Sequence, residues 1–520
     1  MLRTRRTAGP GNGTLRPIPA LGEIHVRLWQ QLGVGVVVVL VGAALARAQS
    51  PAHWPQWRGP QGTGAAPASC RPPVKWDAAS NVKWKVPVPG DGTSTPVIWG
   101  DQIFVLAALP ADGSAAPSGQ TAPDRPPSDK KGPPPEERKK GPPPFGKGPP
   151  PFDKGKGPPP FEKGKGGFGK GPKGGRGGFG GSPPPTEAYQ FVLLCYDRNT
   201  GKTLWQQVCR QEVPHEGFRP GDGSFAASSA VTDGEHVLAF FGSRGLYCFD
   251  LAGKRLWEKD FGDQRTRNGF GEGATPALHG NTVVVPWDHE DDDFIVALDK
   301  RTGDELWRQE RDEPTGWSTP LVVEHQGQAQ VILGGTNRVR SYDLATGKQL
   351  WECEGLTTNV IPTAVTKDGV VFITSGYQGY KLLAIRLGST GDLTGTDAIV
   401  WRIDRDTPYV ASPLLSGDRL YFFKSRESVL SCVDARTGKP YYTGQRIGDL
   451  GASVYASPVS AGGHVYLVGR NGTTVVIRDA DQFEVVSTNV LDDPIDASPA
   501  VAGNELFLRS RQYLYCIGEK

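Results

Sequence analysis

Short stretches of alternating hydrophobic and polar residues recur along most of the chain. Three of them are 419–425 (RLYFFKS), 464–470 (HVYLVGR) and 505–511 (ELFLRSR), and each follows a turn rich in Gly, Asp or Asn. A period of two is typical of strands with one buried face, and such turns are typical of hairpins. The 69 Gly and 46 Pro among 520 residues exclude a helical bundle, because both residues interrupt helices. The pattern therefore predicts an all-β chain of short strands.

One segment of the form Asp-x-x-Thr-Gly-x-x-x-Trp repeats along the chain. Its copies are CYDRNTGKTLW at 195–205, CFDLAGKRLW at 248–257, ALDKRTGDELW at 297–307, SYDLATGKQLW at 341–351 and CVDARTGKPYY at 432–442. The residues that define the repeat are Asp197, Trp205, Asp250, Trp257, Asp299, Trp307, Asp343, Trp351 and Asp434. A further copy at 383–401 has Arg386 at the Asp position and a longer turn. Repetition at about 40–50 residues is typical of propeller blades.

The motif has a structural explanation. An Asp at the end of a strand can accept backbone N–H groups of a tight turn, Thr can do the same, and Gly supplies the positive φ. The Trp then lies at a fixed distance along the outer strand, where it can pack against the neighbouring unit. We therefore interpret the Asp, Thr and Trp residues of the motif as structural. Cysteines share one strand position of the repeat, and we interpret them as small buried residues: Cys195, Cys248, Cys432 and Cys516.

A second marker, in most copies Ser or Thr followed by Pro, precedes each unit. It occurs eight times, at 95–96, 229–230, 275–276, 319–320, 361–362, 412–413, 457–458 and 498–499. The last unit lacks an outer Trp strand, but 81–86 (NVKWKV) supplies one, with Trp84 in the motif position. Such closure leaves no open sheet edge, and about 45 residues per unit suit a four-stranded blade. The sequence predicts an eight-bladed β-propeller over 81–520, closed by an N-terminal strand.

These blades resemble the tryptophan-docking repeats of PQQ-binding-like β-propeller proteins. That family includes quinoprotein alcohol dehydrogenases and the propeller lipoprotein of outer-membrane β-barrel assembly. Residues 54–60 (WPQWRGP), and Arg311-Asp312-Glu313 shortly before Trp317, are similar to the secreted PQQ-like propellers of planctomycete-type bacteria. The resemblance implies the fold and leaves the function open.

The N-terminal region carries a targeting pattern. Residues 33–46 (GVGVVVVLVGAALA) form an uncharged apolar run that leads into Ala46-Arg47-Ala48, a sequence with the A-x-A form of a signal-peptidase site. The run is shorter than the roughly 20 residues that a membrane span needs. We predict a cleaved signal peptide over 1–48, an N-terminal extension over 49–80, and a secreted or periplasmic protein.

A low-complexity insert at 110–188 interrupts blade 1. Gly and Pro make up 33 of the 54 residues in 132–185, and GPPPF repeats alternate with lysines. Because such a stretch cannot bury a core, we predict that it is disordered and partly polyproline II. Two interpretations remain open. It is a tolerated solvated insertion, or it is a basic tether for anionic polymer or membrane, or for the acidic propeller itself.

The formal net charge of +3 conceals three regions of different charge. Residues 1–48 carry +5 and 124–176 carry +8, which leaves −10 for the remainder. An acidic folded part argues against binding of nucleic acid, since that binding needs a basic surface. We expect a monomer that binds an envelope protein or a small ligand.

Loops that enter the first strand of each blade should meet around the mouth of the central channel. Aromatic and charged residues that converge there mark the default place for a ligand or partner. The candidate residues are Arg219, Phe270, Glu272, Arg311, Trp317, Asn359, Tyr409, Tyr455 and Asp496. The alternative is that each of them packs its own loop.

The densest acidic cluster is 288–293 (DHEDDD), in the hairpin between two strands of blade 3. Its carboxylates are candidate calcium ligands, although they lack EF-hand spacing and a turn glycine. The candidates are Asp288, Glu290, Asp291 and Asp292. We favour the alternative, a solvated acidic hairpin.

For an active quinoprotein, the resemblance implies a vicinal cysteine pair, an Asp base and a calcium set of Glu, Asn and Asp. The sequence has no adjacent cysteines, and its residues cannot be matched to a catalytic set one by one. We therefore expect a non-catalytic binding scaffold without a resident cofactor. The alternative is a periplasmic quinoprotein-like oxidoreductase that uses PQQ and calcium.

Overall fold

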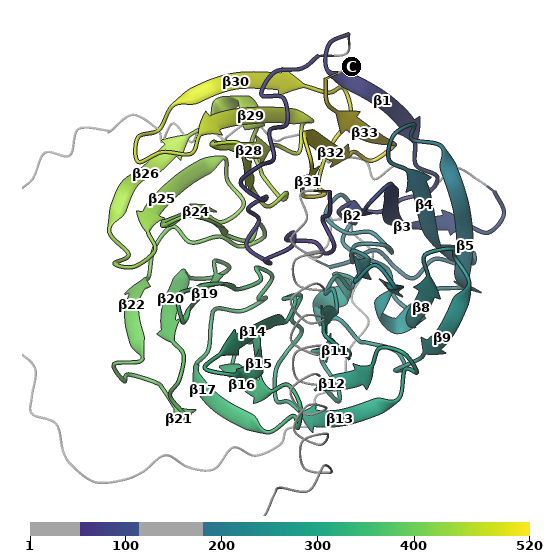
Figure 1. Ribbon diagram of the computed structural model, residues 1–520. Helices are drawn as coiled ribbons and strands as arrows, with labels where there is room; N and C mark the ends of the chain where they lie inside the picture. Colours follow the sequence, from purple (N-terminus) through teal and green to yellow (C-terminus); the bar gives the residue numbers. More distant parts are fainter. Residues whose placement is uncertain (1–51, 78, 114–179, 520) are drawn as a thin grey trace, which may run out of the picture. The chain divides into compact units, whose positions relative to one another are not determined.

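The computed structural model describes residues 52–77, 79–113 and 180–519. Almost all of them belong to one unit, Met1–Gln120 with Gly181–Lys520. This unit consists of eight β-sheets arranged as the blades of a propeller (Figure 1). The predicted fold class is therefore confirmed. The predicted signal peptide and most of the insert lie outside the described residues.

In seven of the eight sheets, four antiparallel strands follow the chain outward from the channel, whereas the outer strand of the eighth sheet comes from the N-terminal part of the chain. Blades 1 and 2 comprise β2 (Val97–Trp99), β3 (Gln102–Pro110), β4 (Tyr189–Asp197) and β5 (Thr203–Glu212), then β6 (Val231–Thr232), β7 (His236–Phe240), β8 (Leu246–Asp250) and β9 (Arg255–Lys259). Blades 3 and 4 comprise β10 (Ala277–His279), β11 (Thr282–Trp287), β12 (Phe294–Asp299) and β13 (Glu305–Glu310), then β14 (Leu321–His325), β15 (Gln328–Leu333), β16 (Arg338–Asp343) and β17 (Gln349–Glu354).

The second half of the ring repeats this order. Blades 5 and 6 comprise β18 (Val365–Lys367), β19 (Val370–Ser375), β20 (Lys381–Arg386) and β22 (Ile399–Ile403), then β23 (Leu414–Ser416), β24 (Arg419–Phe423), β25 (Val429–Asp434) and β26 (Pro440–Arg446). Blades 7 and 8 comprise β27 (Val459–Ala461), β28 (His464–Val468), β29 (Thr473–Arg478) and β30 (Val485–Val490), then β31 (Ala500–Ala502), β32 (Glu505–Arg509) and β33 (Tyr513–Ile517). Three short 3₁₀ turns occur in the described loops: η1 (Gly242–Arg244), η2 (Arg267–Gly269) and η3 (Gly448–Leu450).

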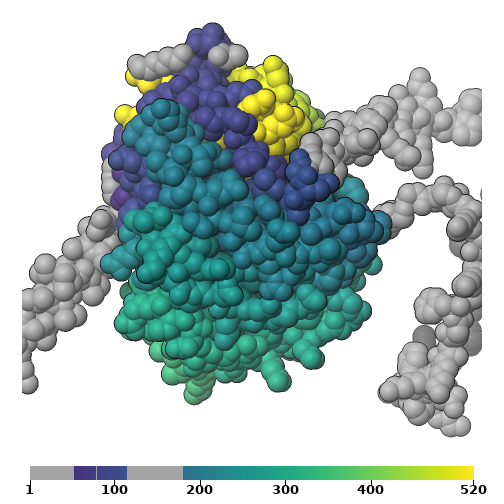
Figure 2. Space-filling view, turned by 90° about the vertical axis from the view of Figure 1, so that its right-hand side faces the viewer, coloured from purple at the N-terminus to yellow at the C-terminus, as the bar shows by residue number. Residues whose placement is uncertain are grey.

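The ring closes through its N-terminal strand, as the sequence predicts. β1 (Val82–Pro87) pairs antiparallel with β33 and forms the outer strand of blade 8, with Trp84 opposite Cys516. In Figure 2 the N-terminal residues, in purple, lie beside the last residues, in yellow. Pairing of the two ends removes the open sheet edges that an unclosed ring would expose.

The repeat motif connects each blade to the next. Asp197 Oδ1 accepts hydrogen bonds from the N–H and the hydroxyl of Thr200, at 2.8 and 2.7 Å. The turn then bends at Gly201, whose φ is +71° and where a Cβ would lie 2.8 Å from Trp84. The indole N–H of the motif Trp donates to a carbonyl oxygen of the following blade in five pairs: Trp84–Arg198, Trp205–Leu251, Trp257–Lys300, Trp307–Leu344 and Trp401–Ala435.

Trp351 departs from this arrangement. Its Nε1 donates to Gln330 Oε1 within the same blade, at 3.0 Å, because the following turn is the longer one after Arg386. Part of that turn forms β21 (Gly391–Asp392), which pairs in parallel with β17 as a fifth strand of its sheet. The sequence indicates the longer turn but not the added strand.

The Ser and Thr residues of the second marker connect the inner strands around the channel. At six junctions between described blades, a side-chain oxygen accepts the backbone N–H of the preceding blade at 2.9–3.2 Å. The donor–acceptor pairs are Thr95–Ser229, Ser229–Thr275, Thr275–Thr319, Thr363–Ser412, Ser412–Ser457 and Ser457–Ser498. These contacts explain why small hydroxyl residues recur at this position.

The cysteines at the repeat position are buried, as predicted. Burial raises the pKa of Cys195, Cys248 and Cys432 to about 12. These thiols therefore stay protonated at neutral pH and behave as small core residues.

Residues 52–66, which we call the strap, run into the centre of the ring (Figure 1, purple). The backbone of Trp54 exchanges two hydrogen bonds with Ile98 of blade 1, at 2.8 and 2.9 Å. On the other side of the channel, Ala66 N–H donates to Ser460 O of blade 7 at 2.8 Å. The strap therefore crosses the channel, a path that the sequence does not predict.

Within the described ranges, no helix has the length and apolar character of a membrane span.

Candidate functional site

The loops that enter the inner strands enclose a cavity of about 210 Å³ at one mouth of the channel. Each loop precedes the first strand of its blade, so residues far apart in sequence converge there. Seven of the nine predicted residues line this cavity: Arg219, Phe270, Glu272, Trp317, Tyr409, Tyr455 and Asp496. The strap contributes Trp57, whose Nε1 donates to Ser498 Oγ at 3.1 Å.

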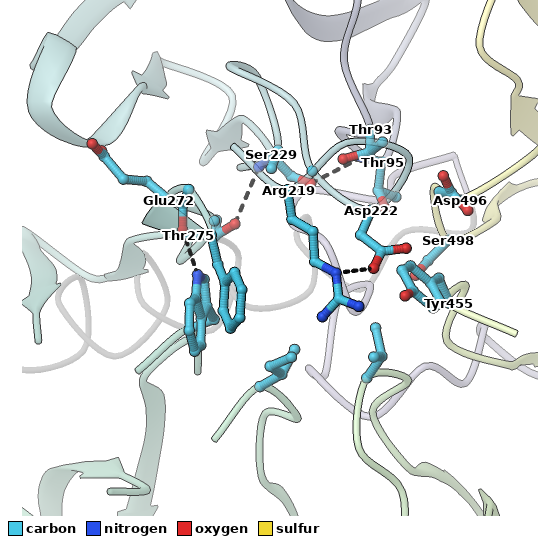
Figure 3. A pocket seen from close by; sticks show the side chains of 18 of the residues that line it. Thr93, Thr95, Arg219, Asp222, Ser229, Glu272, Thr275, Tyr455, Asp496 and Ser498 are labelled. Carbon is cyan, nitrogen blue, oxygen red and sulfur yellow. Dashed lines mark hydrogen bonds and ion pairs between the residues drawn. The ribbon is translucent and has the colours of Figure 1, made fainter. Parts of the chain in front are cut away.

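Arg219 points into the cavity (Figure 3). Its Nε lies 2.9 Å from Asp222 Oδ2, and its guanidinium lies 5.4 Å from the ring centre of Phe270. A second guanidinium, that of Arg426, lies 3.8 Å from the same carboxylate and donates to the hydroxyl of Tyr455 at 3.2 Å. Arg219 and Arg426 are 38% and 45% exposed, so both present positive charge to a ligand.

The aspartates of the cavity already form ion pairs with arginines. Arg470 Nη1 lies 3.0 Å from Asp222 Oδ1, and Arg470 Nε lies 2.6 Å from Asp496 Oδ1. Arg511 Nη2 holds the other oxygen of Asp496 at 2.6 Å. Four arginines therefore lie around three aspartates, because Arg470 contacts both Asp222 and Asp496, and Arg511 also pairs with Asp91 at 3.3 Å. The more exposed of these arginines, Arg219 and Arg426, give the accessible end of the site an excess of positive charge.

Aromatic rings form the walls of the cavity. Tyr409 stacks on Tyr377 with ring centres 4.8 Å apart, and Arg470 lies 3.9 Å from the ring centre of Tyr455. Trp317 Nε1 donates to Gly271 O at 2.7 Å, which fixes the indole. Burial, with the nearby charge of Asp222, raises the pKa of Tyr455 to about 12, so its hydroxyl remains a hydrogen-bond donor at neutral pH.

Glu272 also lines the cavity, but its carboxylate turns away from Arg219 (Figure 3). Its two oxygens accept the backbone N–H and the hydroxyl of Ser243, both at 2.6 Å. Burial raises the pKa of Glu272 above its ordinary value. Glu272 thus connects the loop of blade 3 to blade 2.

The remaining two predicted mouth residues do not line the cavity. Arg311 is buried, and its Nε and Nη2 contact the two oxygens of Asp288 at 2.7 and 3.1 Å. Asn359 is only 2% exposed and adopts a φ of +59°. Arg311 thus connects its loop to the hairpin that carries Asp288.

The acidic hairpin of blade 3 is held by separate contacts. Asp288 pairs with Arg311, Glu290 Oε1 accepts the hydroxyl of Thr315 at 2.8 Å, and Asp291 pairs with Arg265. Asp288 is buried, whereas Asp291 and Asp292 are exposed. These carboxylates point to different partners rather than to one common centre.

A calcium ion with PQQ, which the family resemblance implies, does not fit the carboxylates of the cavity. A calcium ion takes six to eight oxygen ligands, but arginines hold Asp222 and Asp496, and Ser243 holds Glu272. Among the described residues, the one group of three potential ligands within 4.8 Å is Asp233, Glu235 and His236, on another part of the propeller.

The sequence does not predict three residues in or beside the cavity: Asp222 and Arg426 line it, and Arg470 contacts Asp222. Arg426 and Arg470 lie in the hairpins between the second and third strands of blades 6 and 7, and Asp222 lies three residues after Arg219. The acidic hairpin at 288–293 occupies the equivalent place in blade 3. The hairpins between the second and third strands all emerge on the face of the channel mouth. This shared position could have predicted Arg426 and Arg470 from the sequence.

Comparisons with known proteins agree with the fold. Residues 190–443 match the family model described as outer membrane protein assembly factor BamB. No curated protein matches the chain. The eight sheets define the chain as an eight-bladed β-propeller, and a little under half of its residues match this family model.

Three solved structures are similar to this chain. Quinohemoprotein alcohol dehydrogenase from Comamonas testosteroni is 10% identical, with a TM-score of 0.54 over 92% of this chain and 84% of that one. A europium-containing methanol dehydrogenase is 9% identical, with a TM-score of 0.53 over 90% and 91%. BamB from Moraxella catarrhalis is 15% identical, with a TM-score of 0.44 over 62% and 88%. Identities this low bear on the fold and not on the activity.

Proposed function

We propose that the chain is a non-catalytic binding propeller of the cell envelope, and that it holds a carboxylate ligand in the channel-mouth cavity. The supporting observation is the pair of accessible guanidinium groups, Arg219 and Arg426, beside Phe270 and Tyr455. Arginine matches a carboxylate with paired N–H donors, and the aromatic walls suit a planar or apolar group attached to it.

Two sources of that carboxylate fit the cavity, a small organic acid and an acidic side chain of a partner protein. The description of the matched family model as an assembly factor supports the partner protein. The signal peptide predicted over 1–48 supports an envelope location.

The alternative function is a quinoprotein-like oxidoreductase that uses PQQ and calcium. The similarity in fold to two dehydrogenases favours it. The contacts of the cavity carboxylates argue against this alternative. Arginines already pair with Asp222 and Asp496, and Ser243 binds Glu272, so calcium would have to displace arginines from both aspartates.

Titration calorimetry with two probes tests the proposed site. The probes are isophthalate, a planar dicarboxylate, and the tripeptide Glu-Phe-Glu with blocked ends, so that the stronger binder identifies the source. We expect Arg219→Gln and Arg426→Gln each to weaken binding about tenfold, through loss of a charge-assisted contact. Arg402→Gln, an exposed arginine of outer strand β22, is the matched control. Absence of binding by both probes, or equal binding by all three variants, would contradict the proposal.

The basic insert supports a second contact with the envelope. Its net charge of +8 over 124–176 is of the kind that binds anionic polymer or membrane in a salt-dependent way. Deletion of 112–186 should lower retention on vesicles of anionic lipid at low salt. Retention equal to that of the full chain would instead identify the insert as a tolerated insertion.

A further inference from the structure

A second and larger cavity, of about 610 Å³, lies beyond the strap. Hairpin residues 279–281, with Asp233 and Glu235, line it at the opposite ends of the inner strands from the loops around Arg219. Trp57 lines both cavities, so the strap separates them. The volume falls within the range of about 300–1,000 Å³ that is typical of ligand sites.

The strap shows how a peptide can occupy this face of the channel. It forms backbone hydrogen bonds to one residue of the inner strand in each of four blades, over 2.8–3.1 Å. These residues are Ile98 in blade 1, Thr232 in blade 2, Leu415 in blade 6 and Ser460 in blade 7. In an antiparallel pair, alternate residues turn their N–H and C=O away from the partner strand. The strap forms hydrogen bonds with these outward-facing N–H and C=O groups, on the edges of the innermost strands that face the channel.

The equivalent positions of blades 3 and 4 face the larger cavity. Leu278 pairs with Val283 one residue before the hairpin pair His279–Thr282, the register that Ile98 has in blade 1. In the longer β14, Val322 lies three residues before His325 of the hairpin pair His325–Gln328. Because orientation alternates along a strand, its N–H and C=O face the same way as those of the residue directly before the hairpin pair. Both residues line the cavity, and within the described ranges the strap forms no backbone hydrogen bond to either.

Charge on the rim narrows the class of occupant. Glu235 and Glu324 are exposed carboxylates of the lining, and in the described part of the chain neither pairs with Lys or Arg. Glu324 Oε1 lies 3.2 Å from Nε2 of His279, whereas the neighbouring Asp233 is neutralised by Lys300 at 2.6 Å. The rim therefore favours a positively charged group.

We propose that this cavity binds an extended, lysine- or arginine-bearing segment of a partner protein. The segment adds to the inner strand edges at Leu278 and Val322, as the strap does in blades 1, 2, 6 and 7. Main-chain hydrogen bonds then provide affinity, and Glu235 and Glu324 select basic side chains. This site is distinct from the arginine cavity and has the opposite charge preference.

Fluorescence anisotropy with synthetic peptides tests the proposal on the full chain. The probe is fluorescein-labelled Gly-Val-Lys-Val-Lys-Val-Gly with a blocked C-terminus. One control peptide replaces both lysines by glutamate, and another carries N-methyl groups on alternate backbone nitrogens. We expect the lysine peptide to bind and each control to bind at least about tenfold more weakly.

Charge reversal locates the site. The double variant Glu235→Lys/Glu324→Lys should weaken the lysine peptide about tenfold and strengthen the glutamate peptide. Glu258→Lys/Glu484→Lys, at carboxylates 60% and 54% exposed elsewhere, is the matched control and should change neither.

Three results would overturn the proposal: no binding of the lysine peptide, equal binding of the N-methylated peptide, or no effect of the double variant. Sedimentation velocity adds a fourth. If the chain forms a dimer that Glu235→Lys/Glu324→Lys dissociates, the occupant is a second copy and not a separate partner.

Discussion

The guanidinium of Arg58 donates a hydrogen bond of 2.9 Å to the carbonyl oxygen of Pro413. It also donates to Pro458 O at 3.2 Å, so one strap residue binds the starts of the inner strands of blades 6 and 7. Arg58 is 3% exposed, and its hydrogen-bond acceptors are backbone carbonyl oxygens. The strap is thus anchored near its centre by a buried arginine, which also lines the larger cavity.

Replacement of Arg58 by Met should destabilise the propeller by about 2–4 kcal/mol, because buried carbonyl oxygens lose their charged donor. The midpoint of urea unfolding measures the effect. Arg71→Met, an exposed arginine that follows the strap, serves as the control and should change stability by no more than about 0.5 kcal/mol. Equal midpoints for the two variants would show that the anchor contributes nothing.

The docking of Trp84 on the turn of blade 1 leads to a second prediction. Gly201→Ala places a Cβ 2.8 Å from the indole, at a φ of +71°. A Cβ at Gly100, where φ is +58°, meets no described residue within 4 Å, so Gly100→Ala reports the backbone strain alone. We expect about 1–2 kcal/mol for Gly100→Ala and a further 1–3 kcal/mol, roughly, for Gly201→Ala. Denaturant unfolding of both variants gives the comparison, and a cost for Gly201→Ala no larger than for Gly100→Ala would refute the docking role.

Glu272 predicts a pH dependence of stability. Burial raises its pKa, so the native state holds this proton more tightly than the unfolded chain does. Its contribution to stability is therefore present below the ordinary pKa of Glu and is lost as pH rises through the raised value. Glu272→Gln, which keeps the shape without the ionisation, should remove this loss.

Unfolding at several pH values between 4 and 8, on the wild type and on Glu272→Gln, checks this prediction. The stability of the variant relative to the wild type should increase with pH. Glu258→Gln, at an exposed glutamate of β9, provides the control for loss of a surface charge. A difference between wild type and Glu272→Gln that is constant with pH would contradict the prediction.

The blades could be predicted from the sequence because the contacts that stabilise them are formed by motifs that repeat along the chain. The Asp197–Thr200 turn and the Trp84 contact recur at nearly fixed spacing, so each copy supports the interpretation of the others. The same logic predicts closure by 81–86, since the last blade lacks its outer strand. Among the described strands, β21 has no counterpart in the other blades, so the repeats contain no pattern that predicts it.

The site was only partly predictable. Topology alone placed residues such as Arg219, Trp317 and Tyr455 at the channel mouth, because each precedes an inner strand. Which charges neutralise each other depends on long-range geometry: Arg470 contacts Asp222, 248 residues away. The strap is a single non-repeating segment whose contacts are mainly backbone groups, so no spacing of side chains reveals its path.

The most direct test of the central claim, a binding propeller rather than a quinoprotein, is a dye-linked oxidation assay. The full chain is incubated with PQQ and Ca²⁺, and alcohols and sugars are then offered as substrates. We predict no turnover above the protein-free control. PQQ- and calcium-dependent turnover that Arg219→Gln abolishes would contradict the account and would establish the oxidoreductase alternative.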